Sequence, residues 1–175
     1  MMLKDKAAKI KLLILDVDGV MTDGRIVYND RGEEIKFFNV RDGHGLRLLL
    51  KAGIEVAIIT GRDSKAVESR AKDLGIKEVH QGIKDKEDLC VKLLERKMLK
   101  SDQACCIGDD LPDIPMLSCV GMPVAVADAA VEVRDFACYV TKKNGGNGAV
   151  REVCELILKA QNSWPRIAHD PEKGK

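Results

Sequence analysis

Short apolar segments alternate with amphipathic segments along most of the chain. Five short segments are rich in apolar or β-branched residues and are predicted to form strands. They cover residues 11–17, 55–60, 104–109, 121–126 and 138–141. Four of them are apolar on both faces, which is typical of parallel strands that helices cover on both sides of a sheet.

The segments between these strands carry apolar residues at helical spacing, so we predict helices there. The predicted helices cover residues 43–53, 64–76, 86–98 and 111–120. This alternation of strands and helices predicts an α/β fold with a doubly wound, Rossmann-like parallel sheet. The length of 175 residues suits one buried core, so we expect a single domain over residues 1–175.

Residues 25–40 break this alternation. Two β-patterned arms flank the turn sequence NDRG at 29–32, so we expect a β-hairpin insertion over about residues 24–40, directly after the first strand. In open α/β sheets, ligands bind beyond the carboxyl ends of the strands. The hairpin is therefore expected to form a minimal cap over that edge, or to pair with another subunit. The polar tail at 167–175 is expected to be flexible.

Composition narrows the function classes. Charged residues make up 33% of the chain but leave a net charge of only +1, so no broad field attracts nucleic acid or an anionic membrane. Aromatic residues, at 3%, are too few for stacking on single-stranded nucleic acid. The apolar run near the start is too short for a signal peptide or a membrane span, so we expect a cytoplasmic protein with a small-molecule ligand. The cysteines form no CxxC pair, which favours free thiols in the core.

The strongest local signal is the sequence Asp16-Val17-Asp18-Gly19 at the end of the first predicted strand. Carboxylates two residues apart point the same way from an extended strand, and Gly19 lets the chain turn directly after them. Such close like charges favour a bound cation, and Mg²⁺ is the hard ion that carboxylates, phosphate oxygens and water hold. Taken alone, the motif is also compatible with a structural turn.

A second acidic cluster, Asp109, Asp110 and Asp113, follows another apolar strand, and Pro112 suits the first turn of the next helix. At the carboxyl edge of a parallel sheet this cluster would meet the first one, and together they would make a magnesium site. The alternative is helix capping by Asp110 with Asp113 in the first turn, which is compatible with metal binding by Asp109.

Two further signals follow predicted strands. Thr60 and Gly61 offer a hydroxyl and main-chain N–H groups that can bind phosphate oxygens, although a Thr in this place is often only a helix N-cap. Lys84 or Lys86 could neutralise the aspartates and a phosphate, although exposed lysines are usually solvated. All four signals fall at strand ends, which favours one shared site.

The set DVDGV, IITGR, a Lys after QG, and GDDLPD resembles, in order and spacing, the four motifs of the haloacid dehalogenase-like hydrolase superfamily. The hairpin segment, the stretch TGRDSKAVESRAKDLGI and the final NGGNGAVREVCELIL are similar to the small-capped branch that contains 3-deoxy-D-manno-octulosonate 8-phosphate phosphatases. The resemblance covers roughly residues 10–160, which makes it far more specific than any single motif.

The resemblance implies a role for each matched position. Asp16 is expected to be the nucleophile, and Asp18 the general acid and then the general base. Thr60 is expected to bind the phosphate, and Asp109 to bind Mg²⁺ together with Asp16 and Asp18. Asp113 is expected to support the metal shell or the active-site lysine.

The Gln-Gly-x-x-x-Lys spacing selects Lys86 over the nearby Lys84 as that lysine. The implied activity is magnesium-dependent hydrolysis of 3-deoxy-D-manno-octulosonate 8-phosphate through an aspartyl phosphate, in the synthesis of lipopolysaccharide precursors. Gly61 and Arg62 are expected to contact the substrate, and the Arg62 guanidinium could pair with a sugar carboxylate. Phosphatases of nine-carbon sialic-type sugar phosphates are similar too, and they remain the alternative.

The resemblance to this branch implies a homotetramer. In such a tetramer, a neighbour's hairpin and a Gly-rich segment help to close the site. The Gly-rich loop at 144–148 and the C-terminal helix after it are expected to cover about residues 144–162. This loop is either a mobile lid or an ordinary loop before the helix. Arg41, Asp42 and His44 follow the hairpin and are expected near the substrate entrance.

Three other classes fit the pattern less well. A two-component receiver domain needs adjacent acids and a phosphoacceptor Asp on a middle strand, whereas here the acids are spaced DxD and the middle strand ends in Thr60. A phosphomutase would need a large closing cap, for which the chain has no room. A noncatalytic oligomerisation module, which occurs fused to sialic-acid-activating enzymes, is disfavoured by the intact acidic and lysine motifs.

Overall fold

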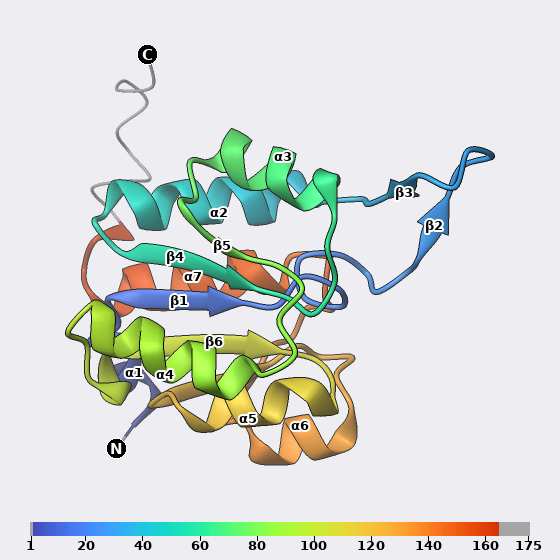
Figure 1. Ribbon diagram of the computed structural model, residues 1–175. Coiled ribbons are helices and arrows are strands. Elements are labelled where there is room, and N and C mark those ends of the chain that lie inside the picture. The colour runs from blue at the N-terminus through green and yellow to red at the C-terminus, as the bar shows by residue number, and fades with distance from the viewer. Residues whose placement is uncertain (1, 165–175) are drawn as a thin grey trace.

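Six parallel strands form the sheet at the centre of the computed structural model, which describes residues 2–164 (Figure 1). Their order across the sheet is β5–β4–β1–β6–β7–β8. They are β1 (Leu12–Leu15), β4 (Glu55–Ile59), β5 (Glu78–His80), β6 (Ala104–Gly108), β7 (Met122–Ala125) and β8 (Tyr139–Val140). The chain order reverses at β1, which pairs with β4 on one side and β6 on the other. Ligands bind at such a switch point in doubly wound folds.

The burial of the strands follows from their composition. Every residue of β1 and β6 is buried, as is every residue of β4 except Glu55. The prediction of parallel strands that are covered on both faces is therefore confirmed. The edge strand β5 is the short strand that the sequence implies before Lys84 and Lys86. It was not among the five segments with predicted bounds, because its three residues are only partly buried and two of them are polar.

Helices cover both faces of the sheet. They are α1 (Leu3–Ala7), α2 (Val40–Lys51), α3 (Lys65–Leu74), α4 (Lys86–Arg96), α5 (Ile114–Ser118), α6 (Val131–Phe136) and α7 (Ala149–Ala160), with short 3₁₀ helices at Ser101–Gln103 and Leu111–Asp113. Helix α2 packs on α7, and α4 packs on α5. In Figure 1, α4 lies in front of the sheet and α7 lies behind it. The predicted doubly wound α/β fold is confirmed.

Local side chains fix where the helices begin and end. Helix α2 begins at Val40, three residues before the prediction, because the Asn39 side chain accepts hydrogen bonds from the N–H groups of Arg41 and Asp42. The Asp85 side chain caps α4 in the same way. Helix α3 ends at Gly75, whose φ of 79° lies in the left-handed region that glycine adopts without strain.

The predicted hairpin consists of two short antiparallel strands, β2 (Val27–Tyr28) and β3 (Glu34–Ile35). It projects away from the sheet in Figure 1. The Asn29 side chain holds the turn by accepting hydrogen bonds from two main-chain N–H groups, at 2.9 Å each. The hairpin therefore reaches beyond the edge of the sheet where the acidic motifs lie.

The described residues share one apolar core. Four of the six free cysteines are buried in it or beside it, as expected for small core residues. Among the described residues, no helix has both the length and the apolar character that crossing a membrane requires. The tail predicted at 167–175 lies outside the described residues.

Candidate active site

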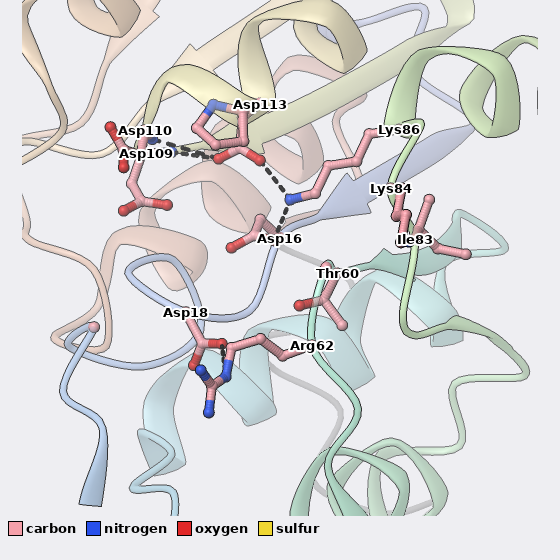
Figure 2. A pocket seen from close by; sticks show the side chains of 13 residues that line it. Asp16, Asp18, Thr60, Arg62, Ile83, Lys84, Lys86, Asp109, Asp110 and Asp113 are labelled. Atoms are coloured by element: carbon pink, nitrogen blue, oxygen red, sulfur yellow. Dashed lines mark hydrogen bonds and ion pairs between the residues drawn. The ribbon is translucent and has the colours of Figure 1, made fainter.

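A cavity of about 420 Å³ opens where β1, β4 and β6 end (Figure 2). The residues that the sequence predicts for catalysis, metal binding and phosphate or substrate binding all line this cavity. These residues are Asp16, Asp18, Thr60, Gly61, Arg62, Lys86 and Asp109. Parallel strands place their carboxyl ends at one edge of the sheet, so motifs that lie far apart in the sequence meet there.

The first acidic segment turns sharply after β1. The main-chain N–H of Asp16 continues the sheet by donating to Ile107 at 3.2 Å, and the Asp16 side chain is buried. Gly19 follows with a φ of 90°, and a Cβ atom there would lie 2.0 Å from a carboxylate oxygen of Asp109. A glycine is therefore required for the two acidic segments to approach each other.

Lys86 lies between two buried carboxylates (Figure 2). Its Nζ donates to Asp16 Oδ1 and to Asp113 Oδ1, each at 2.6 Å, and its side chain is only 9% exposed. Burial alone would lower the pKa of Lys86, but Asp16 and Asp113 outweigh burial and raise it above its usual value. The lysine is therefore charged. Of the two candidate lysines, it is Lys86 that the structure places on Asp16, whereas Lys84 is an exposed residue of the cavity wall.

Three carboxylates gather around this lysine. Oxygen atoms of Asp16, Asp109 and Asp113 lie within 4.8 Å of one another. Burial and then Asp113 raise the pKa of Asp16 from 3.8 to about 7. Burial, then Asp113 and Asp16, raise the pKa of Asp109 to about 8. One lysine does not balance three acids, and a hard divalent cation with oxygen ligands fits this donor set.

The remaining acids of the two motifs have other partners. The Asp18 carboxylate lies outside the cluster of three carboxylates described above. Its Oδ1 pairs with Lys36, and its Oδ2 lies 3.8 Å from Arg62 Nε. A contact between this carboxylate and the metal would require its side chain to turn. Asp110 caps the following 3₁₀ helix by accepting from the N–H of Leu111 at 2.8 Å, so the capping interpretation holds beside a metal site.

Thr60 and Arg62 follow β4. Thr60 is buried, and its main chain is fixed by hydrogen bonds with His80 and Ile83. The Arg62 guanidinium donates to the Tyr28 hydroxyl at 3.2 Å and to Glu34 Oε1 at 2.8 Å. Arg62 thus connects the cavity to the hairpin, and its contact with a sugar carboxylate stays a prediction.

The glycine-rich loop at 144–148 packs against the first acidic segment. A Cβ atom on Gly145 would lie 1.6 Å from the carbonyl oxygen of Gly19. The N–H of Gly146 donates to the carbonyl of Val20 at 3.0 Å. Close backbone contact therefore explains these glycines. Of the two alternatives, it favours an ordinary packed loop before α7 over a mobile lid.

Of the three residues expected near the substrate entrance, Arg41, Asp42 and His44, none lines the cavity. Asp42 is buried, and its carboxylate accepts from the N–H groups of Gly148 and Arg151 at 3.2 and 2.7 Å. It therefore stabilises the first turn of α7, because unpaired N–H groups and the positive end of the helix dipole lie there.

Sequence reasoning missed the hairpin residues that reach the site, Glu34 and Lys36. The signal was present in the segment Glu34-Ile35-Lys36-Phe37, where charged and apolar residues alternate. On an extended strand this alternation places the two charged side chains on one face and the two apolar ones on the other.

The comparisons with known proteins agree with this geometry. The model of the haloacid dehalogenase-like hydrolase family matches residues 78–153. The 3-deoxy-D-manno-octulosonate 8-phosphate phosphatase KdsC of Yersinia pestis is 53% identical over 157 residues, which are 90% of this chain and 84% of that protein.

Two solved structures extend the comparison. The 3-deoxy-D-manno-octulosonate 8-phosphate phosphatase from Moraxella catarrhalis, in complex with a magnesium ion, a phosphate ion and a KDO molecule, has a TM-score of 0.92 and 47% identity, covering 94% of this chain and 95% of that one. The cobalt-bound phosphatase from Haemophilus influenzae has a TM-score of 0.86 and 43% identity, covering 90% and 92%.

The chain belongs to the haloacid dehalogenase-like hydrolases. The resemblance inferred from its motifs, including that to the branch of 3-deoxy-D-manno-octulosonate 8-phosphate phosphatases, is confirmed.

Proposed function

We propose that this chain is a magnesium-dependent phosphatase that hydrolyses 3-deoxy-D-manno-octulosonate 8-phosphate to 3-deoxy-D-manno-octulosonate and phosphate. The observation that carries the proposal is the placement of Lys86 between Asp16 and Asp113, with Asp109 beside them, in a cavity of a chain 53% identical to a phosphatase of this substrate. The reaction supplies a precursor of lipopolysaccharide.

The carboxylates of Asp16 and Asp109 would hold the metal. Mg²⁺ supplies positive charge that offsets the negative charge of the phosphoryl oxygens and of the carboxylates themselves. Lys86 holds the Asp16 carboxylate from the other side and fixes its orientation toward the cavity. Asp113 holds Lys86 in turn, and one of its oxygens accepts from the N–H of Asp109 at 3.0 Å.

In the first step, Asp16 attacks phosphorus as the bond to the sugar oxygen breaks. A proton on Asp18 passes to the departing oxygen, which leaves as the sugar hydroxyl. The hydroxyl and main-chain N–H groups that follow β4, from Thr60 and Gly61, hold phosphoryl oxygens in place.

In the second step, a water molecule attacks the phosphorus of the aspartyl phosphate. Asp18, now ionised, takes a proton from this water, and the bond to Asp16 breaks to release phosphate. The cycle leaves both aspartates as they began.

The Arg62 guanidinium lies on the wall of the cavity and supports an acidic sugar as the substrate. Its present partners, Glu34 and Tyr28, belong to the hairpin. A sugar carboxylate would compete with Glu34 for the same N–H groups, so binding of an acidic substrate would be coupled to the position of the hairpin.

We also propose a cytoplasmic homotetramer. The outward face of the hairpin carries exposed Ile35 and Phe37, with exposed Val40 just beyond it. Apolar side chains on a projecting hairpin favour a second copy of the chain as their cover. Sedimentation should show the tetramer dissociating in Phe37→Ser. It should not dissociate in Met98→Ser, because Met98 is an even more exposed apolar residue that lies outside the hairpin. A wild-type monomer would contradict this assembly.

The substrate is tested by phosphate release with Mg²⁺ from three esters: 3-deoxy-D-manno-octulosonate 8-phosphate, a nine-carbon sialic acid phosphate and a neutral hexose phosphate. We expect a strong preference for the eight-carbon acid. Preference for the nine-carbon acid would keep the reaction and replace the substrate. No release from any ester by folded protein would favour the noncatalytic module.

A further inference from the structure

Lys36 is a buried cation outside the cavity. It follows the second hairpin strand, and its side chain is only 1% exposed. Its Nζ pairs with Asp18 Oδ1 and lies 3.3 Å from Glu34 Oε1. Lysine is almost never buried to this extent unless its charge is paired, so the two carboxylates account for its position.

The hairpin delivers this cation by strand alternation. Glu34 and Lys36 point toward the body of the protein. Ile35 and Phe37, which alternate with them along the chain, are exposed, and Phe37 is 67% exposed. Lys36 does not line the cavity, although Asp18 does. The ammonium group therefore contacts Asp18 from outside the lining of the cavity.

We propose that Lys36 is a positioning residue that orients Asp18 for proton transfer; this inference rests on the proposed function. Lys36 holds Oδ1, so we assign the proton to Oδ2, which lies 3.8 Å from Nε of the cavity-lining Arg62. As the Asp16–phosphorus bond forms and the phosphorus–oxygen bond of the ester breaks, this proton moves from Oδ2 to the departing oxygen. Asp18 is left ionised beside Lys36.

A merely structural Lys36 would anchor the hairpin and affect all substrates alike. A positioning Lys36 affects only substrates whose leaving group needs a proton. The sugar alkoxide is a poor leaving group and needs one, whereas the nitrophenolate of p-nitrophenyl phosphate leaves without one. The parameter kcat/KM covers only the steps up to release of the leaving group, so the later hydrolysis of the aspartyl phosphate does not enter the comparison.

The test compares kcat/KM of Lys36→Met for the sugar phosphate and for p-nitrophenyl phosphate. General acid catalysis is worth about 10²–10⁴-fold, so we expect a loss of at least about 30-fold for the sugar phosphate and of less than about 3-fold for the aryl ester. Lys97→Met is the matched control, because Lys97 is also a largely buried lysine between two glutamates. Lys97 and its partners Glu55 and Glu78 lie outside the cavity lining, and Glu55 is at the start of β4, the end away from Thr60. This control should lower neither value by more than about 3-fold.

Equal losses on both esters, or no loss on either, would overturn the assignment. If the unpaired Asp18 charge prevents Lys36→Met from folding, Asp18→Asn is compared with the double variant Asp18→Asn/Lys36→Met, which removes both charges. Because Lys36 acts through Asp18, the two should differ by less than about 3-fold on the sugar phosphate. A further loss of about 10-fold would contradict the proposal. Wild-type protein that hydrolyses neither ester would instead refute the proposed function.

Discussion

Replacing Asp16 by Asn is expected to abolish turnover and, in the metal-free protein, to stabilise the fold. The substitution removes the nucleophile but keeps the shape of the side chain. It also removes a charge that the site tolerates poorly, because Asp16 is buried beside Asp113 and Asp109. The ionised nucleophile therefore lowers the free energy of unfolding until a cation binds.

The structure gives the size of this effect. Burial and Asp113 raise the pKa of Asp16 from 3.8 to about 7. A raised carboxyl pKa means that the folded state binds the proton more tightly, so stability is present at low pH and is lost as the pH rises from about 4 to about 7. One pKa unit corresponds to about 1.4 kcal/mol, so ionised Asp16 lowers the free energy of unfolding by up to about 4 kcal/mol at pH 8. Because the neighbouring acids share this effect, we expect Asp16→Asn to gain about 2–4 kcal/mol there.

Urea unfolding in EDTA at about pH 8 and about pH 4 measures this gain, which should shrink at the lower pH. Asp30→Asn, in the exposed turn of the hairpin, is the matched control and should change stability by less than about 0.5 kcal/mol. Mg²⁺ should stabilise the wild-type protein more than Asp16→Asn. A variant less stable than the wild type in EDTA at the higher pH would contradict the destabilising effect of ionised Asp16. A variant that retains turnover would contradict the role of Asp16 as the nucleophile.

Three further predictions concern the lysine, the arginine and the packed loop. Lys86→Met should lower kcat/KM for p-nitrophenyl phosphate by at least about 100-fold, and an unchanged rate would remove this residue from the mechanism. Arg62→Ala should lower kcat/KM by about 10- to 100-fold for the acidic sugar phosphate but much less for a neutral hexose phosphate, and equal losses would exclude recognition of the carboxylate. Gly145→Ala should lower the free energy of unfolding by about 3 kcal/mol, because its Cβ would overlap the Gly19 carbonyl. Gly53→Ala is the control: its Cβ would meet no atom, but the positive φ of Gly53 should still lower the free energy of unfolding by about 1–2 kcal/mol. Equal costs for the two, measured by urea unfolding, would contradict the packing argument.

Much of the site could be predicted because its chemistry lies at strand ends. Asp16, Thr60 and Asp109 each follow a short apolar run, and parallel strands bring such positions to one edge of a sheet. The order of the strands, with β1 between β4 and β6, then gathers the motifs into one cavity. Local patterns therefore predict both the fold and the place of the acids.

The remaining features depend on pairings between distant residues. No local pattern shows that Lys36 contacts Asp18, or that Gly145 touches the Gly19 carbonyl, because each depends on how the hairpin or loop packs on the body. No local pattern shows the burial of Asp42 either, because its partners are main-chain groups at the start of α7. Short edge elements such as β5 lack the apolar signal that identifies the central strands.

Trapping the phosphoryl group on Asp16 is the direct test of the proposed aspartyl phosphate. Protein mixed with Mg²⁺ and substrate would be quenched in acid within one turnover, digested and analysed by mass spectrometry. We expect one phosphoryl group on the peptide that contains Asp16, and none in Asp16→Asn, which should release no phosphate. A phosphoryl group on another residue, or steady phosphate release by Asp16→Asn, would contradict the proposed role of Asp16.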